Sequence, residues 1–214
     1  MTINNSPHTR FVFCKHSFAF FCVVLILTGL AACSDNDGLE DHTYDRWKER
    51  NDSAFHAVFT EAQKAIEQGD TKWRILRRYE STLPVSESNS IVVRIDKVGE
   101  GTVCPLYTDS VRVNYLGTLL TGKAFDHSGF YSDYASVFSP QFCSPVAFCV
   151  SGTTSGFATA LQYMHVGDIW HIWTPYQLAY GVDGTDKIPG YSMLQFDLQL
   201  LQYSHSGQPL PRWK

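Results

Sequence analysis

Residues 111–128 read VRVNYLGTLLTGKAFDHS, and this stretch decides which fold the chain can adopt. Its first half carries the alternation and β-branched enrichment of a half-buried strand, and Thr121-Gly122 marks a turn. Phe125 and Asp126 follow just beyond that turn. Because Asp is disfavoured in strands, Asp126 either ends a strand facing water or is held, partly buried, beside apolar groups for a purpose.

The segments around this hairpin extend the same pattern. Alternating or β-rich runs occupy residues 90–101, 145–150, 168–175 and 193–204, and each is typical of a strand. Residues 156–164, GFATALQYM, instead place apolar groups at the spacing of one short helix. Strands joined by hairpins with a single helix indicate an antiparallel α+β domain.

A longer helix precedes this domain. Apolar residues recur close to every 3.6 positions across residues 43–68, and Gly69 provides a C-terminal stop. Such a helix needs a surface that covers its apolar stripe, which is either its own domain or, in a homodimer, a second copy. Residues 70–88 are mixed: WRILRRYE fits a short helix or a strand, and STLPVSESNS reads as a loop.

The first 33 residues form a separate segment. Arg10 and Lys15 precede an apolar run too short to be a convincing membrane span. The run ends in Leu30-Ala31-Ala32-Cys33, which resembles the bacterial lipobox, so residues 1–32 are expected to be a lipoprotein signal peptide and Cys33 the lipidated residue. An ordinary signal peptide with a chance cysteine is the alternative. Residues 33–42, CSDNDGLEDH, form an acidic tether that resembles a surface-export tag or is a solvated linker.

Charge and cysteine spacing argue against a nucleic-acid-binding protein and against a cysteine metal site. The 214-residue chain has a formal charge of −4, without the basic excess of a nucleic-acid-binding protein. Once Cys14, Cys22 and Cys33 are set aside, Cys104, Cys143 and Cys149 remain, at spacings that fit no metal site. An oxidising compartment permits one disulfide among them. Cys143 and Cys149 are the nearest pair, but the pairing stays open.

Several motifs occur together, and in order, between Ile91 and Tyr203. They are the NYLG of residues 114–117, GKAFD at 122–126, GFATALQYMHVGD at 156–168, LAYG at 178–181 and IPGYSMLQFDLQLL at 188–201. This combination resembles the FKBP-type peptidyl-prolyl cis-trans isomerases. The resemblance implies an antiparallel sheet wrapped around one short helix over residues 89–204, with residues 43–88 as a helical extension and linker and 205–214 as a C-terminal tail.

The resemblance also implies a shallow apolar pocket between sheet and helix. Its catalytic residues would be Tyr115, Phe125, Asp126, Tyr180 and Phe196. Its substrate-binding residues would be Val146, Thr154 through its backbone N–H, Phe157 as the floor, and Ile188. Thr153-Thr154 stands where the family commonly has Val-Ile, Phe157 where it has Trp, and Val146 where it has an aromatic residue, and residues 129–144 form a longer loop. These departures predict lowered or altered activity.

The expected function is therefore prolyl isomerisation without a metal or other cofactor. The substrates would be proline-containing polypeptides, and the setting would be the envelope of a Gram-negative bacterium, with the protein held at the outer membrane by lipid on Cys33. Two alternatives remain open. One is a non-catalytic chaperone module that holds peptides in the same groove, and the other is a structural subunit of an outer-membrane assembly that uses the 43–68 helix.

Overall fold

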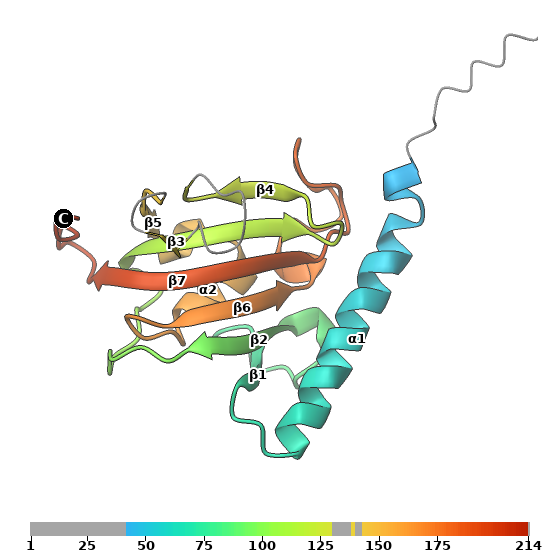
Figure 1. The fold of residues 1–214 in the computed structure, drawn as a ribbon, viewed down its shortest axis with the longest axis horizontal. Coiled ribbons are helices and arrows are strands. Elements are labelled where there is room, and N and C mark those ends of the chain that lie inside the picture. Colours follow the sequence, from blue (N-terminus) through green and yellow to red (C-terminus); the bar gives the residue numbers. More distant parts are fainter. Residues whose placement is uncertain (1–41, 130–137, 140–142, 214) are drawn as a thin grey trace, which may run out of the picture. The chain divides into compact units, whose positions relative to one another are not determined.

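Seven antiparallel strands and two helices form the part of the chain that the computed structural model describes, residues 42–129, 138–139 and 143–213 (Figure 1). The strands are β1 (Trp73–Arg77), β2 (Ser90–Lys97), β3 (Ser110–Leu119), β4 (Ala124–His127), β5 (Val146–Cys149), β6 (Ile169–Thr174) and β7 (Leu194–Ser204). The helices are α1 (Trp47–Glu67) and α2 (Ser155–Leu161), with single 3₁₀ turns η1 (His42–Tyr44), η2 (Glu87–Asn89), η4 (Val150–Gly152) and η5 (Tyr176–Leu178).

The strands follow the spatial order β1-β2-β6-β7-β3-β4 in one sheet. The central strand β3 pairs with β7 along its whole length on one side. On its other side, the first half of β3 pairs with β5 and the second half with β4. The sheet therefore splits beside β3, and this split places the start of α2 next to the hairpin that carries Phe125 and Asp126.

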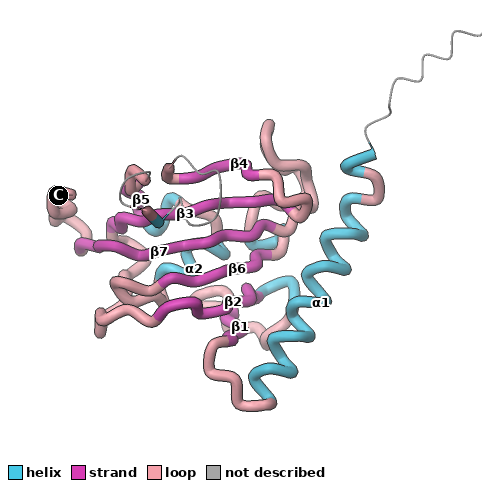
Figure 2. The backbone as a smooth tube through the Cα atoms, in the orientation of Figure 1, coloured by secondary structure: helices cyan, strands magenta, loops and turns pink. Residues whose placement is uncertain are grey.

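Helix α2 is buried from Gly156 to Leu161 and lies against one face of the sheet (Figures 1 and 2). Leu161 packs with Ile172 and Leu198 in the main hydrophobic cluster. A Cβ on Gly156 would lie 2.3 Å from Cγ2 of Thr174 on β6, so only glycine permits this close approach. An antiparallel sheet covering one short helix, preceded by a helical extension, confirms the fold class expected from the sequence.

Helix α1 packs against its own sheet. Its buried side chains Phe55 and Phe59 join Trp73, Val92 and Met193 in a second hydrophobic cluster. Gly69 has φ 84° two residues after the helix ends, as a C-terminal glycine stop requires. Of the two surfaces considered for this helix, its own domain therefore covers the apolar stripe, while a homodimer contact remains a prediction.

Polar contacts fix the first turns of α1 to the residues just before β7. The indole Nε1 of Trp47 donates a hydrogen bond to Oγ of Ser192 at 2.9 Å. The side-chain Oδ1 of Asn51, which is buried, accepts one from the backbone N–H of Met193 at 2.9 Å. Because this stretch ends the loop that begins after Tyr180, α1 supports that loop as well as the sheet.

Residues 73–77, which the sequence left between helix and strand, form the outermost strand of the sheet. Trp73 stacks on Trp173 of β6, with ring centroids 5.5 Å apart and planes 13° apart. Beyond the strand, the N–H of Tyr79 donates to Oγ1 of Thr159 on α2 at 3.1 Å. The segment that follows α1 is thus joined to both the sheet and the central helix.

The sequence expectations for the N-terminus fall on residues 1–41, which lie outside the described part of the chain, as do residues 130–137 and 140–142 of the longer loop. Cys104, Cys143 and Cys149 are free thiols, so the structure does not join Cys143 to Cys149. Burial raises the pKa of Cys104, with a smaller contribution from Asp168. No helix within residues 42–213 is both long and apolar enough to cross a membrane.

Candidate functional site

A pocket of about 320 Å³ opens between α2 and the end of the sheet that carries β4. Five residues from widely separated segments meet there, and all five were expected at the site: Tyr115, Phe125, Asp126, Tyr180 and Phe196. Thr154 and Phe157 from the start of α2 also line it, together with Phe148, Gly152 and Thr153.

Aromatic rings form the apolar surface of this pocket. Phe157 is buried and meets Tyr115, Phe148 and Phe196 edge to face, with centroids 6.2, 6.2 and 5.1 Å away. Phe125 meets Phe196 in the same way at 5.7 Å. Such edge-to-face contacts hold each ring in a defined orientation, so the pocket has a fixed apolar shape.

Gly117 on β3 makes room for two of these rings. A Cβ at this position would lie 2.5 Å from Cζ of Phe125 and 3.1 Å from Cε1 of Phe196. Because glycine has no side chain, the rings approach each other over the strand. The glycine of the YLG motif therefore shapes the wall of the pocket.

Tyr115 and Asp126 form the polar pair of the site. The hydroxyl of Tyr115 donates a hydrogen bond to Oδ2 of Asp126 at 2.7 Å, and Oδ1 of Asp126 accepts one from the backbone N–H of His127 at 2.9 Å. Burial, reinforced by this hydrogen bond, raises the pKa of Tyr115 far above its ordinary value. Asp126 is exposed, not partly buried as the sequence suggested, because β4 is the outer strand at this edge.

Two hydrogen-bond donors at the pocket are left without a partner in the described residues. One is the hydroxyl of Tyr180, a residue that is 43% exposed. The other is the backbone N–H of Thr154, which directly precedes α2. The side-chain Oγ1 of Thr154 is buried and also unpartnered. The backbone N–H of Thr154 therefore bears on substrate binding, whereas its buried, unpartnered hydroxyl bears on the stability of the protein.

The structure places two expected site residues elsewhere. Val146 packs at the margin of the main core, and Ile188 is buried within it, so neither lines the pocket. Phe148, which the sequence analysis missed, supplies the aromatic ring of β5. The signal was present, because residues 146 and 148 point to the same face of a strand, and the larger side chain is the one that reaches the pocket.

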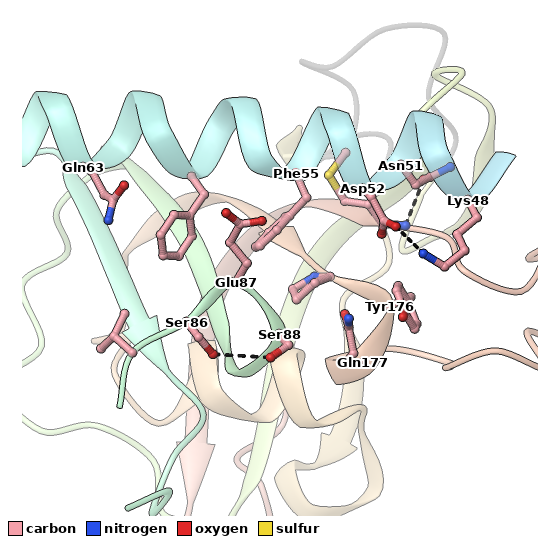
Figure 3. A pocket seen from close by; sticks show the side chains of 14 residues that line it. Lys48, Asn51, Asp52, Phe55, Gln63, Ser86, Glu87, Ser88, Tyr176 and Gln177 are labelled. Carbon is pink, nitrogen blue, oxygen red and sulfur yellow. Dashed lines mark hydrogen bonds and ion pairs between the residues drawn. The ribbon is translucent and has the colours of Figure 1, made fainter. Parts of the chain in front are cut away.

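A larger groove, of about 810 Å³, lies between α1 and the η2 and η5 turns (Figure 3). Figure 3 shows Phe55 and Asp52 pointing from the helix into this groove. Four of its polar side chains are bonded in pairs: Lys48 with Asp52 at 2.5 Å, and Ser86 with Ser88 at 3.3 Å. The smaller pocket is the better candidate site, because there unpaired donors lie beside several aromatic rings and all five expected catalytic residues meet. No cluster of metal-ligating side chains occurs in the described residues.

Comparison with known proteins agrees with this geometry. Residues 102–201 match the sequence model of the family described as FKBP-type peptidyl-prolyl cis-trans isomerase. Residues 102–201 therefore form an FKBP-type domain within this chain. Tyr115, Phe125, Asp126, Phe157, Tyr180 and Phe196 all lie within the matched residues of this FKBP-type domain.

Curated relatives support the assignment. The FKBP-type 22 kDa peptidyl-prolyl cis-trans isomerase of Escherichia coli is 32% identical over 149 residues, which are 69% of this chain and 62% of that protein. The Macrophage infectivity potentiator of Trypanosoma cruzi is 35% identical over 111 residues, 51% of each chain. The chain thus spans 62% and 51% of the length of these two relatives.

A solved structure has the same fold. The crystal structure of a peptidyl-prolyl cis-trans isomerase from Pseudomonas syringae pv. tomato superposes with a TM-score of 0.50 at 26% sequence identity. It covers 72% of this chain and 96% of the solved chain. The arrangement of sheet and helices in the described residues is therefore similar to that of this solved isomerase.

Proposed function

We propose that this protein is a peptidyl-prolyl cis-trans isomerase that acts on proline-containing polypeptides in the pocket of its FKBP-type domain. The observation that carries the proposal is the convergence of four phenylalanine rings, the Tyr115–Asp126 pair and two unpaired donors in one hollow. The family assignment supports the same reaction.

Prolyl isomerisation requires stabilisation of a twisted amide and breaks no covalent bond. Rotation about an X-Pro bond faces a barrier of roughly 18–20 kcal/mol because amide resonance is lost. The planar amide is more polar than the twisted one. An apolar pocket therefore disfavours the ground state relative to the transition state, and donors fixed at the rotated carbonyl lower the barrier further.

Each polar group then has a distinct role in the proposal. The Tyr115 proton is engaged by Asp126, so Tyr115 presents its ring to the proline and is held in place by the carboxylate. Tyr180 has a hydroxyl proton to spare and donates to a substrate carbonyl. The Thr154 N–H is the second such donor, and Phe157 forms the apolar floor.

The direct test is isomerisation of a proline peptide, followed by exchange NMR with the full chain in detergent. The parent should accelerate the exchange, and Tyr180→Phe should lower kcat/KM roughly two- to ten-fold, the value of one hydrogen bond. Asp126→Ala should lower it too, because Tyr115 loses its anchor. Phe157→Trp tests the floor: a gain in kcat/KM would mean that phenylalanine leaves the pocket underfilled.

The same assay separates catalysis from binding alone. A parent that binds the peptide but leaves its exchange rate at the uncatalysed value would be a peptide-holding module, and the proposal of catalysis would be wrong. Displacement of the bound peptide by a macrolide inhibitor of the family would locate the binding at this pocket in either case.

We further propose that the protein is a lipid-anchored envelope protein that assists the folding of exported proteins. The support is the sequence of residues 30–33, which resembles a lipobox, and the acidic tether after it. Labelled fatty acid supplied to expressing cells should enter the parent and not Cys33→Ser. Equal labelling of both proteins, or labelling of neither, would rule out the anchor at Cys33.

A further inference from the structure

A second hollow, of about 380 Å³, lies directly beside the candidate site, the pocket of about 320 Å³ that is called the proline pocket below. The two share Thr153 as a common wall, and Thr154 of the first adjoins Ser155 of the second. An extended polypeptide with its proline in the first hollow would therefore place a neighbouring residue at the second. Tyr107, an exposed aromatic residue, lines the outer margin of this second hollow.

The second hollow contains an unpaired cation. Arg78 lines it, and within the described residues the Arg78 guanidinium has no hydrogen-bond or ion-pair partner, whereas the neighbouring guanidinium of Arg77 is bonded to the carbonyl of Leu83 at 2.9 Å. Arginine is well suited to bind a carboxylate, because its planar donors can bond both oxygens.

The backbone beside Arg78 is held in an unusual conformation. Glu80 also lines the hollow and has φ 60°, in the left-handed region that side chains other than glycine rarely adopt. Two bonds maintain the turn: the N–H of Tyr79 donates to Thr159, and the N–H of Ser81 donates to the carbonyl of Arg78 at 3.0 Å. The turn after β1 is therefore fixed to α2, next to the proline pocket.

One buried group in this hollow lacks a partner as well. Gln162 is 6% exposed, and its Oε1 accepts no hydrogen bond, although its Nε2 donates to the carbonyl of Ala158 at 3.0 Å. An unsatisfied buried acceptor is costly to the folded protein. Because this oxygen is buried and can only accept a hydrogen bond, it does not bind a carboxylate, and the charge of Arg78 carries the argument for the hollow.

We propose that this hollow is a substrate subsite in which Arg78 selects polypeptides carrying an acidic residue beside the proline. Glu80 acts in the opposite sense, because its charge repels the same carboxylate. Arg78 and Glu80 come from the segment between α1 and β2, outside the residues that match the family, whereas the rest of the hollow lies mostly within them. The inference rests on the proposed function for the proline pocket and adds a substrate class to it.

The test uses the full chain and matched proline peptides that carry Ala, Asp or Lys next to the proline, on either side. Affinity is measured by calorimetry and kcat/KM by exchange NMR. The parent should prefer the Asp peptide over the Ala peptide, and Arg78→Gln should reduce that preference by roughly two- to five-fold, as for an exposed charge pair. Glu80→Gln should increase it. Arg77→Gln, which removes the same charge one residue away, should leave it unchanged.

Salt provides an independent readout. An electrostatic preference should shrink as ionic strength rises, because exposed charges are screened beyond about 8–10 Å at physiological salt. A change caused only by misfolding would not follow this trend. Equal effects of Arg78→Gln and Arg77→Gln, or a preference for the Lys peptide, would overturn the proposal.

The outcome for the proline pocket is read separately. Catalysis of the Ala peptide with no Arg78-dependent preference would leave the proposed function intact and reject the subsite. An Arg78-dependent preference in affinity, without catalysis of any peptide, would support the subsite and reject isomerisation.

Discussion

The hydroxyls of Tyr115 and Tyr180 border the same pocket, but only one of them is already engaged in a hydrogen bond within the protein. Tyr115 donates its one proton to Asp126, and Tyr180 has no partner among the described residues. The sequence could place both tyrosines at the site through the NYLG and LAYG motifs. It could not show which proton is free, because that depends on how β3 and β4 align.

Thr154 permits a test of a backbone donor. Its φ of −64° matches the value that proline imposes, and Thr153 before it is extended, as a residue before proline must be. Thr154→Pro should therefore remove the N–H with little strain and lower kcat/KM roughly two- to ten-fold.

Thr154→Ala is the matched control for this backbone test. It keeps the N–H and removes the unpartnered Oγ1, so stability should stay equal or rise and activity should be retained. Thermal unfolding checks both variants. Full activity of the proline variant would exclude the N–H from the mechanism.

The raised pKa of Tyr115 predicts that the folded protein loses stability at alkaline pH. Its folded-state pKa is raised above the ordinary tyrosine value of about 10, mainly by burial, so the folded protein holds this proton more tightly than the unfolded chain does. The contribution is complete below about pH 10 and is lost as the pH rises toward the raised pKa.

Tyr115→Phe should therefore show a smaller drop in urea midpoint between about pH 8 and about pH 10.5 than the parent does. Tyr115→Phe lacks the hydrogen bond to Asp126 at both pH values, so the stability lost with that bond does not affect the size of the drop between them. Identical drops would show that Tyr115 does not carry the alkaline sensitivity.

At the scale of elements, the strands that were easiest to predict from sequence have one face in the core. In β3 and β7 the buried residues Val111, Val113 and Leu198 follow the alternation expected of such a strand, although residues 113–117 of β3 are all buried. β1 stayed ambiguous because WRILRRYE fits a helix as well as a strand, and only pairing with β2 settles it. The hollow beside Arg78 could not be predicted from the sequence either, because Arg78 directly follows β1 and its position depends on the same strand pairing.

The contact between α2 and β6 supplies an element-scale prediction. Gly156→Ala should destabilise the protein by about 1–3 kcal/mol, because the new methyl group would overlap Thr174. Ser155→Ala, one residue earlier and exposed, should change stability by less than about 0.5 kcal/mol. Chemical denaturation measures both. Tolerance of alanine at Gly156 would mean that the helix can move outward freely.

At the scale of the whole molecule, residues 42–213 pack as one unit although the family match covers only residues 102–201. The match omits α1, β1 and β2, and β2 contains the fully buried residues Ile91, Val92 and Val93. The helical extension contributes a hydrophobic cluster of its own. The domain limits 89 and 204 therefore need an experimental test.

A chain of residues 89–204 should be much less stable than one of residues 42–214. It loses Trp47, Phe55, Val58 and Phe59, which are buried in α1. At about 1.5–3 kcal/mol for each buried side chain, the loss is about 6–12 kcal/mol, comparable with the whole stability of a typical domain. Urea unfolding compares the two chains. Equal midpoints would show that α1 and β1 are dispensable for folding.

The stacked rings of Trp73 and Trp173 join the edge strand to the interior of the sheet. Two indoles this close and nearly parallel couple their electronic transitions, which gives a paired positive and negative band in ultraviolet circular dichroism. Detachment of the edge strand would abolish that signature while the rest of the sheet kept its own. The protein thus carries a built-in optical reporter for the segment that supplies Arg78, readable without any label.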